Sequence, residues 1–252
     1  MSDVDLWVLA AVLGAVVLGA VLQRTSGMGT GLVVSPTFVL LIGPVAGVML
    51  TNVTTVVSAL ALAVVMRRDI DWPRFWRIAP TIVIGSVPAA LLVGAVDAGW
   101  LEVVIGAALL VALAPMALSW QLPDLGRAAA PVAGLTGGFL NTAVGVGGPA
   151  VLLYAQATRW AQRAFAATLQ PVFLTMGVVS LATKTLTGAA SGAAGLPQWP
   201  LVVAAVASVP LGVLVGGRVA RHVTPAAGRR VAVAVVVLGA TATLVRGVLA
   251  VT

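Results

Sequence analysis

GMGTG at residues 27–31 separates an apolar run at 6–23 from a second apolar run at 32–42. A helix of about twenty apolar residues crosses the ~30 Å hydrocarbon core of a bilayer, and a run half as long does not. The second run is therefore predicted to be a half-span that begins inside the membrane. Glycines interrupt the helix, which leaves backbone N–H groups without their helical hydrogen bonds. At that depth these groups need partners in protein, water or ligand.

Two interpretations of this break are open. A helix that begins at Thr30 or Gly31 turns its unpaired N–H groups and the positive end of its dipole into the gap, an arrangement that binds anions. Alternatively, the glycines only allow helices to pack closely. A second Gly-rich break, GVGGP at 145–149, favours the anion-binding interpretation.

The composition is that of an integral membrane protein. Of 252 residues, 60% are hydrophobic and 8% are charged, and the mean hydropathy is +1.12. The absence of cysteine excludes disulfides and thiolate metal sites. No cofactor is expected. The net charge of +7 is attributed to membrane topology rather than to nucleic-acid binding.

Short charged or Gly/Pro-rich stretches divide the chain into ten predicted helical segments. They lie at about 5–24, 30–43, 45–66, 75–95, 99–119, 128–144, 147–157, 161–184, 199–217 and 229–250. The fold class is thus an all-α polytopic membrane protein. The acidic start with Asp3 and Asp5 is unlike a cleavable signal, so the first helix is expected to be retained.

Basic connections indicate the orientation, because such loops face the cytoplasm. They contain Arg67, Arg68, Arg74, Arg77, Arg127, Arg159, Arg163, Arg218, Arg221, Arg229 and Arg230. This distribution predicts N- and C-termini on the outside of a bacterial-type plasma (inner) membrane. Lys184 and Arg246 are exceptions, because this topology places both basic residues toward the outer side.

Sequence matches in the same order predict two halves, 1–122 and 123–252. Gly27, Gly29 and Thr30 lie 118 residues before Gly145, Gly147 and Gly148, and SVPAALLVG at 86–94 matches SVPLGVLVG at 208–216 at six of nine positions. Halves of five elements each must be oppositely oriented. Inverted repeats with interrupted helices are typical of secondary transporters whose substrate site lies at the membrane midplane. In this chain the site is predicted to lie between the positive ends of two helix dipoles, which favour a small anion.

Polar residues near the two breaks are the candidates for the substrate site. The predicted substrate-binding residues are Arg24, Thr25, Ser26, Gly27, Gly29, Thr30, Gly31, Thr51, Asn52, Asn141, Thr142, Gly145, Gly147, Gly148, Thr168 and Gln170. An offset of 118 pairs Asn52 with Gln170, whereas a motif alignment pairs Thr51 with Thr168. Interhelical hydrogen bonding is the alternative role for these side chains. Arg24 either faces the cavity or extends toward the inner surface.

Several motifs resemble the TauE/SafE sulfite exporter family, also called the toluene-sulfonate uptake permease group. They are GMGTGLVVSP at 27–36, TNVTT at 51–55, GVGGP at 145–149 and AATLQP at 166–171. The resemblance extends from about Leu13 to Val245. It implies a plasma-membrane transporter of sulfite, sulfonates or related sulfur-containing anions. Thr30 and Pro149 stand where further glycines are common in the family.

The predicted function is export of a small sulfur oxyanion or organosulfonate. The acids lie near the predicted membrane surfaces, so coupling to protons or sodium through a buried carboxylate is not expected. An anion channel and an uptake permease for sulfonates or other small organic anions are the alternatives. No Ser/His/Asp set or paired carboxylate supports an enzyme. The expected partners are the anion and the lipid bilayer, without nucleic acid, and a homo-oligomer is left open.

Overall fold

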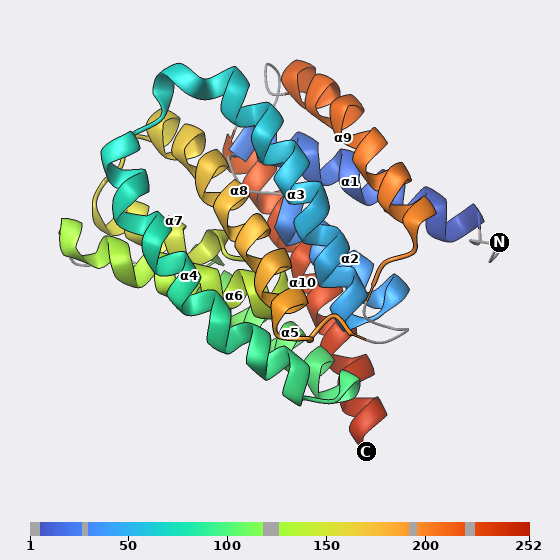
Figure 1. Cartoon of the computed structure of the whole chain (residues 1–252). Coiled ribbons are helices and arrows are strands. Elements are labelled where there is room, and N and C mark those ends of the chain that lie inside the picture. The colour runs from blue at the N-terminus through green and yellow to red at the C-terminus, as the bar shows by residue number, and fades with distance from the viewer. Residues whose placement is uncertain (1–5, 27–29, 118–125, 192–195, 220–224) are drawn as a thin grey trace.

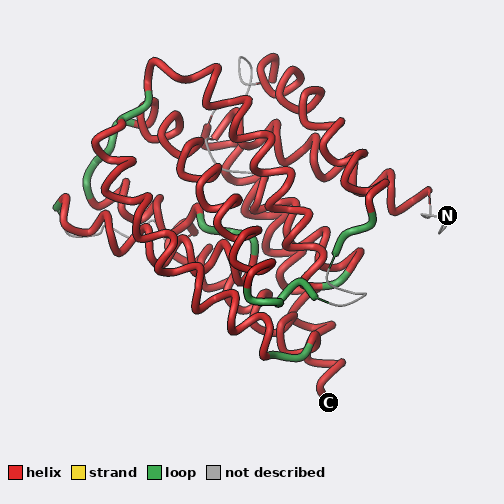
Figure 2. Tube along the Cα trace, in the orientation of Figure 1, coloured by secondary structure: helices red, strands yellow, loops and turns green. Residues whose placement is uncertain are grey.

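A computed structural model describes residues 6–26, 30–117, 126–191, 196–219 and 225–252, which form helices and short connections without a strand (Figure 2). Ten α-helices lie in these ranges. They are α1 (Leu6–Ser26), α2 (Thr30–Ile42), α3 (Pro44–Met66), α4 (Trp72–Ala95), α5 (Ala98–Ala117), α6 (Ala130–Val144), α7 (Gly148–Ala157), α8 (Gln162–Leu186), α9 (Trp199–Val219) and α10 (Pro225–Val251). The predicted all-α polytopic fold is confirmed.

Helix length separates membrane spans from half-spans. Within the described residues, six apolar stretches are long enough to cross a bilayer, and they lie in α1, α3, α4, α8, α9 and α10. By contrast, α2 has 13 residues and α7 has 10, too few for a span. The half-span predicted after the first break is therefore present, and α7 is a second one.

Local sequence explains the helix boundaries. The fourth helix begins at Trp72 rather than near residue 75, because the Asp71 side chain accepts a hydrogen bond from the Arg74 N–H at 3.1 Å and Pro73 occupies the first turn. At the end of α6, Gly145 has φ 78° and its N–H donates to Asn141 O. Glycine adopts this left-handed conformation without a steric cost, so α6 ends there.

Helices of the first predicted half pack against helices of the second. Helix α1 packs against α9, α4 against α6, α5 against α10, and α3 against α8. In Figure 1, α1 and α9 lie on one side of the molecule and α4 and α6 on the other, with α3 and α8 between them. The inverted relation between the halves stays a prediction. Its proposed boundary between 122 and 123 lies outside the described residues.

Close packing accounts for some of the glycines. A Cβ atom added to Gly85 of α4 would lie 2.0 Å from Leu135 O of α6, and one added to Gly134 would lie 2.2 Å from Ile78 O. The backbones of α4 and α6 are thus in direct contact. This is the packing role that small residues have between membrane helices. Close packing also holds at the described glycines of the breaks, where a Cβ atom on Gly31 would lie 2.8 Å from Gly145 O.

Candidate functional site

Each half-span folds back along the helix that precedes it. A Cβ atom on Gly19 of α1 would lie 3.0 Å from Thr30 Cα of α2, and one on Gly147 would lie 2.6 Å from Gly137 O of α6. The two resulting hairpins meet at their tips. A Cβ atom added to Gly31 would lie 2.8 Å from the carbonyl oxygen of Gly145. The second break therefore lies directly against the first turn of α2.

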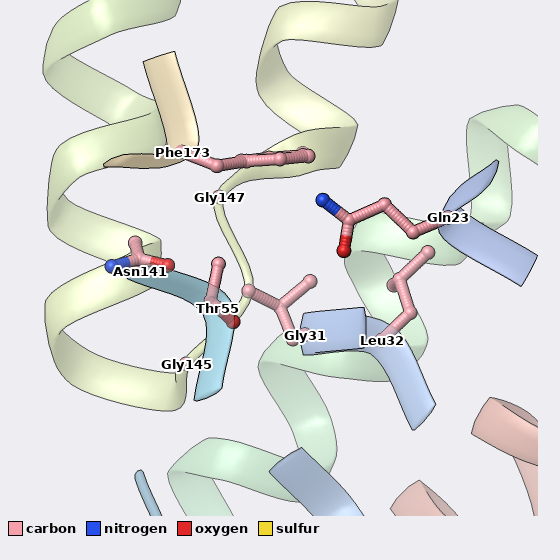
Figure 3. Close-up of a pocket in the computed structure, with 10 residues that line it drawn as sticks. Gln23, Gly31, Leu32, Thr55, Asn141, Gly145, Gly147 and Phe173 are labelled. Atoms are coloured by element: carbon pink, nitrogen blue, oxygen red, sulfur yellow. The ribbon is translucent and has the colours of Figure 1, made fainter. Parts of the chain in front are cut away.

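A small cavity lies where the hairpins meet. Its free volume is about 20 Å³, and it is lined by Gln23, Gly31, Leu32, Thr55, Asn141, Gly145, Val146, Gly147, Gly148 and Phe173. Figure 3 shows the Gln23 side chain extending into it from α1, and the Phe173 ring lying above this amide. The first residues of α2 and of α7 both contribute, so the positive ends of two helix dipoles face the same space.

Gln23 is held by a buried hydrogen-bond network. Its Nε2 donates to Gln170 Oε1 of α8 at 2.7 Å. Its Oε1 accepts from the Thr30 hydroxyl and, at 3.3 Å, from the Ser58 hydroxyl. Gln23 is 1% exposed. The amide is consequently fixed beside the cavity by side chains from α2, α3 and α8.

A second amide pair lies on the other side of the cavity. Asn141 Nδ2 donates to Asn52 Oδ1 at 2.8 Å, and Asn52 Nδ2 donates to Ser180 Oγ at 3.0 Å. The two pairs correspond in sequence, since Gln23 lies 118 residues before Asn141 and Asn52 lies 118 residues before Gln170. Each pair thus joins one half-span hairpin to the long helix of the other half.

Hydroxyl groups supply donors that remain free. Thr55 lines the cavity, and its Oγ1 is buried with no hydrogen-bond partner among the described residues. Thr142 Oγ1, on the helix that also carries Asn141, is in the same condition. A buried hydroxyl without a partner costs free energy until a ligand or water satisfies it. None of the described residues that line the cavity carries a charge.

Comparison with known proteins gives one match. The sequence model of the family described as Sulfite exporter TauE/SafE matches residues 11–243. The chain belongs to the TauE/SafE family. The predicted family membership is confirmed, and proteins of this family are membrane transporters. Neither the curated proteins nor the solved structures contain a match to the chain.

Five of the predicted site residues line the cavity of this TauE/SafE protein, namely Gly31, Asn141, Gly145, Gly147 and Gly148. Three more do not line the cavity but hydrogen-bond to the side-chain amides that do: Thr30 and Gln170 to Gln23, and Asn52 to Asn141. Gly27 and Gly29 lie outside the described residues, and Thr25 and Ser26 form the last residues of α1.

Thr168, Thr51 and Arg24 are not among the lining residues, although Thr51 lies next to one of them, since a Cβ atom on Gly145 would be 3.5 Å from Thr51 Cγ2. The Thr168 hydroxyl accepts from Asp71 N at 2.8 Å and donates to Ala164 O at 2.7 Å, beside the connection before α4. Thr51 donates to Gly47 O of its own helix at 2.8 Å. Arg24 packs against α9, where a Cβ atom on Gly216 would lie 3.0 Å from Arg24 Cβ.

Sequence reasoning missed half of the lining. Gln23 had a usable signal, because the offset of 118 pairs it with the predicted Asn141. Thr55 lies in the TNVTT motif that marked Thr51 and Asn52. Leu32 and Val146 lie in the GMGTGLVVSP and GVGGP motifs but are apolar and were not selected, and Phe173 of α8 lies in no motif.

Proposed function

We propose that the protein is a carrier that exports a small sulfur oxyanion or organosulfonate, and that the anion binds in the cavity between the α2 and α7 starts. The observation that carries this proposal is the convergence of two helix N-termini on one uncharged, donor-rich space. Backbone N–H groups at helix starts bind oxyanions without any basic side chain. A cation at this place would face two positive dipole ends.

The donors around the cavity fit an oxyanion. The Asn141 amide and the free Thr55 hydroxyl lie on the lining, together with the amide of Gln23. A sulfonate or sulfite group presents three oxygen acceptors, and amide and hydroxyl donors complement them. A neutral site also releases its anion more readily than one built on a buried cation would, which favours turnover.

The cavity volume supports a carrier with a closed state. About 20 Å³ holds roughly one water molecule, so an oxyanion enters only when the lining moves apart. Phe173 is a long apolar side chain at the cavity, and its rotation is expected to enlarge the space beside the fixed Gln23 amide. Alternating movement of the two hairpins would open the cavity to one side at a time.

Export needs no coupling ion in this scheme. An anion that leaves a negative-inside cell gains ~2.3 kcal/mol per charge per 100 mV. The buried carboxylate of Glu102 is engaged by Arg246 rather than directed to the cavity. We place both termini outside in a bacterial-type inner membrane, and we assign no enzymatic reaction to the chain.

Flux into proteoliposomes tests the proposal with sulfite, sulfate, thiosulfate, sulfoacetate and carboxylate controls. Thr55→Val removes the free hydroxyl at nearly constant volume, and Thr136→Val makes the same change at an exposed site on α6. A hydrogen bond to a charged ligand contributes ~1.5–3 kcal/mol, so Thr55→Val is expected to raise the half-saturation concentration roughly tenfold to a hundredfold. Thr136→Val is expected to behave as wild type.

Two results would count against this assignment. Absence of flux for every sulfur anion in the panel would contradict the proposed substrate class. An unchanged half-saturation concentration in Thr55→Val would contradict the cavity as the binding site. Saturable exchange between internal and external anion supports a carrier. An ohmic single-channel current would instead indicate a channel.

A further inference from the structure

Lys184 is a buried cation that the cavity does not use. It is the single lysine of the sequence and lies in the last turn of α8. Its side chain is 0% exposed, and its Nζ has no hydrogen-bond partner among the described residues. An ammonium group has three donors and is costly to bury without an opposite charge. Ionisable groups in this condition inside a membrane are candidates for ion pathways.

No described carboxylate is available to Lys184. Asp69 pairs with Arg163, Asp71 with Arg74, and Glu102 with Arg246. Asp97 is exposed in the connection between α4 and α5. The neighbouring residues 192–195, which the structure does not describe, are Gly-Ala-Ala-Gly and contain no acid. Among the described residues, no carboxylate therefore supplies the opposite charge that Lys184 needs.

Lys184 lies on the face of α8 that also reaches the cavity. The buried residues Gln170, Phe173, Gly177, Ser180 and Lys184 follow one another at intervals of three or four, the spacing of one helix face. Phe173 lines the cavity, and Ser180 belongs to the hydrogen-bond chain from Asn141 through Asn52. At ~1.5 Å per residue, Lys184 is about 6 Å beyond Ser180 and about 16 Å beyond Phe173 along the axis.

The chain after α8 folds back at Lys184. Ala190 N donates to Lys184 O at 3.2 Å, and Gly188 has φ 75°, which turns the backbone. The turn also lies against the end of α4, where a Cβ atom on Gly94 would be 3.4 Å from Ala189 Cβ. By the predicted topology this end of α8 is the outer one, opposite the basic connection that contains Arg159 and Arg163.

We propose that Lys184 forms a second anion-binding site, on the outward side of the central cavity, that pairs with the exported sulfur oxyanion or sulfonate before release. The inference rests on the proposed export function. The neutral cavity selects the anion, and Lys184 lies on the same buried face of α8 as the lining residue Phe173. The turn at 187–191 must move for the anion to leave. The ligand is the oxyanion of the exported solute, and a binding measurement separates it from a lipid headgroup phosphate, which offers the same chemistry.

Transport measurements test the role of the charge. Lys184→Met removes the charge at similar length, Lys184→Arg retains it, and Arg68→Met removes one positive charge from an exposed connection. Loss of a charged hydrogen-bond partner is expected to raise the half-saturation concentration for sulfoacetate or sulfite roughly tenfold or more. Lys184→Arg is expected to retain most of the affinity, and Arg68→Met all of it. A merely structural lysine would instead change the unfolding temperature and leave the affinity unaltered.

A spectroscopic measurement reports on binding without transport. Protein labelled with [13Cε]lysine and carrying a lysine-free tag gives one signal, because Lys184 is the single lysine. We expect this signal to shift saturably with sulfoacetate in detergent free of phospholipid, and not with choline chloride at equal ionic strength. A shift with phosphatidylglycerol but not with sulfoacetate would identify a lipid site and overturn the proposal.

The outcomes separate this inference from the proposed function. Wild-type flux together with an unmoved lysine signal and normal Lys184→Met kinetics would overturn the second site and leave the central cavity intact. A shifted lysine signal without flux of any sulfur anion would retain an anion site at Lys184 and remove the export function. A response of the lysine signal in Thr55→Val would support two distinct sites.

Discussion

At Gly31 the first hairpin contacts the second without space for a side chain. The atom that a Cβ would meet is a backbone oxygen, Gly145 O at 2.8 Å, so it cannot rotate away. Gly145 itself has φ 78°, and a Cβ there would lie 2.7 Å from Ser35 Oγ. These two glycines therefore fix how closely the hairpin tips approach, and with it the size of the cavity.

Gly31→Ala is expected to abolish most anion flux, because the added methyl group pushes the hairpins apart. Overpacking of this kind costs about 1–3 kcal/mol, which a lowered unfolding temperature would report. Gly14→Ala is the matched control, since a Cβ atom at Gly14 of α1 meets nothing within 4 Å. Wild-type flux in Gly31→Ala would contradict the contact.

Glycines and amides could be predicted as site residues because they stand out in an apolar sequence. Gly31, Asn141 and Gly145 were found in this way. Phe173 could not be, because only packing determines which apolar side chain faces the cavity. The role of Thr168 in the substrate site stays a prediction. Its hydroxyl accepts from the backbone N–H of Asp71, a contact between residues 97 apart that no local pattern reveals.

Among the helices, α2 is held at its C-terminal end by a charge pair from two others. Arg246 of α10 donates to Val39 O and Leu40 O at 2.8 and 2.5 Å, and its Nε donates to Glu102 Oε2 of α5 at 2.7 Å. The last carbonyls of a helix lack partners within it, and a cation there also complements the dipole. The half-span is thereby anchored opposite its cavity end.

Arg246→Met is expected to destabilise the protein by about 3 kcal/mol, the lower end of the ~3–5 kcal/mol for breaking a buried pair. The lower end applies because the Arg246 side chain is 41% exposed. Glu102→Gln is expected to cost about 1 kcal/mol, since the amide still accepts a hydrogen bond and the arginine reaches water. Thermal unfolding in detergent measures both, with Arg68→Met as control. Equal effects of the two changes would contradict this asymmetry.

The helix boundaries followed well from the sequence, and the ten predicted segments coincide with the ten described helices within a few residues. Charge placement was less informative inside the protein. Lys184 and Arg246 do not follow the rule for loop charges because both lie within helices, where Lys184 is buried and Arg246 pairs with Glu102. That rule describes connections at the membrane surface.

Across the whole molecule, the main helix contacts join the first predicted half to the second. The packed pairs α1 with α9, α4 with α6, α5 with α10 and α3 with α8 each take one helix from either half. Both amide pairs at the cavity also cross between the halves. Neither half contains its own core, although sequence repetition alone would allow two independent units.

Fragments 1–122 and 123–252 are therefore expected to be unstable when expressed separately, and to copurify and restore flux when expressed together. The contacts between halves provide the physical reason. Affinity purification through a tag on one fragment and proteoliposome flux measure the result, and fragments mixed after separate purification serve as control. A fragment that is monodisperse and stable on its own would contradict this interdependence.

The Gln23–Gln170 bond has a consequence for biogenesis. Its partners are 147 residues apart, and at ~5–20 residues per second the ribosome needs roughly 7–30 s to synthesise the intervening chain. During this interval the amide of Gln23 has no access to its partner on α8. We therefore expect the first hairpin to reach its final packing only after α8 has been synthesised, because Gln23 Nε2 lacks this acceptor until then.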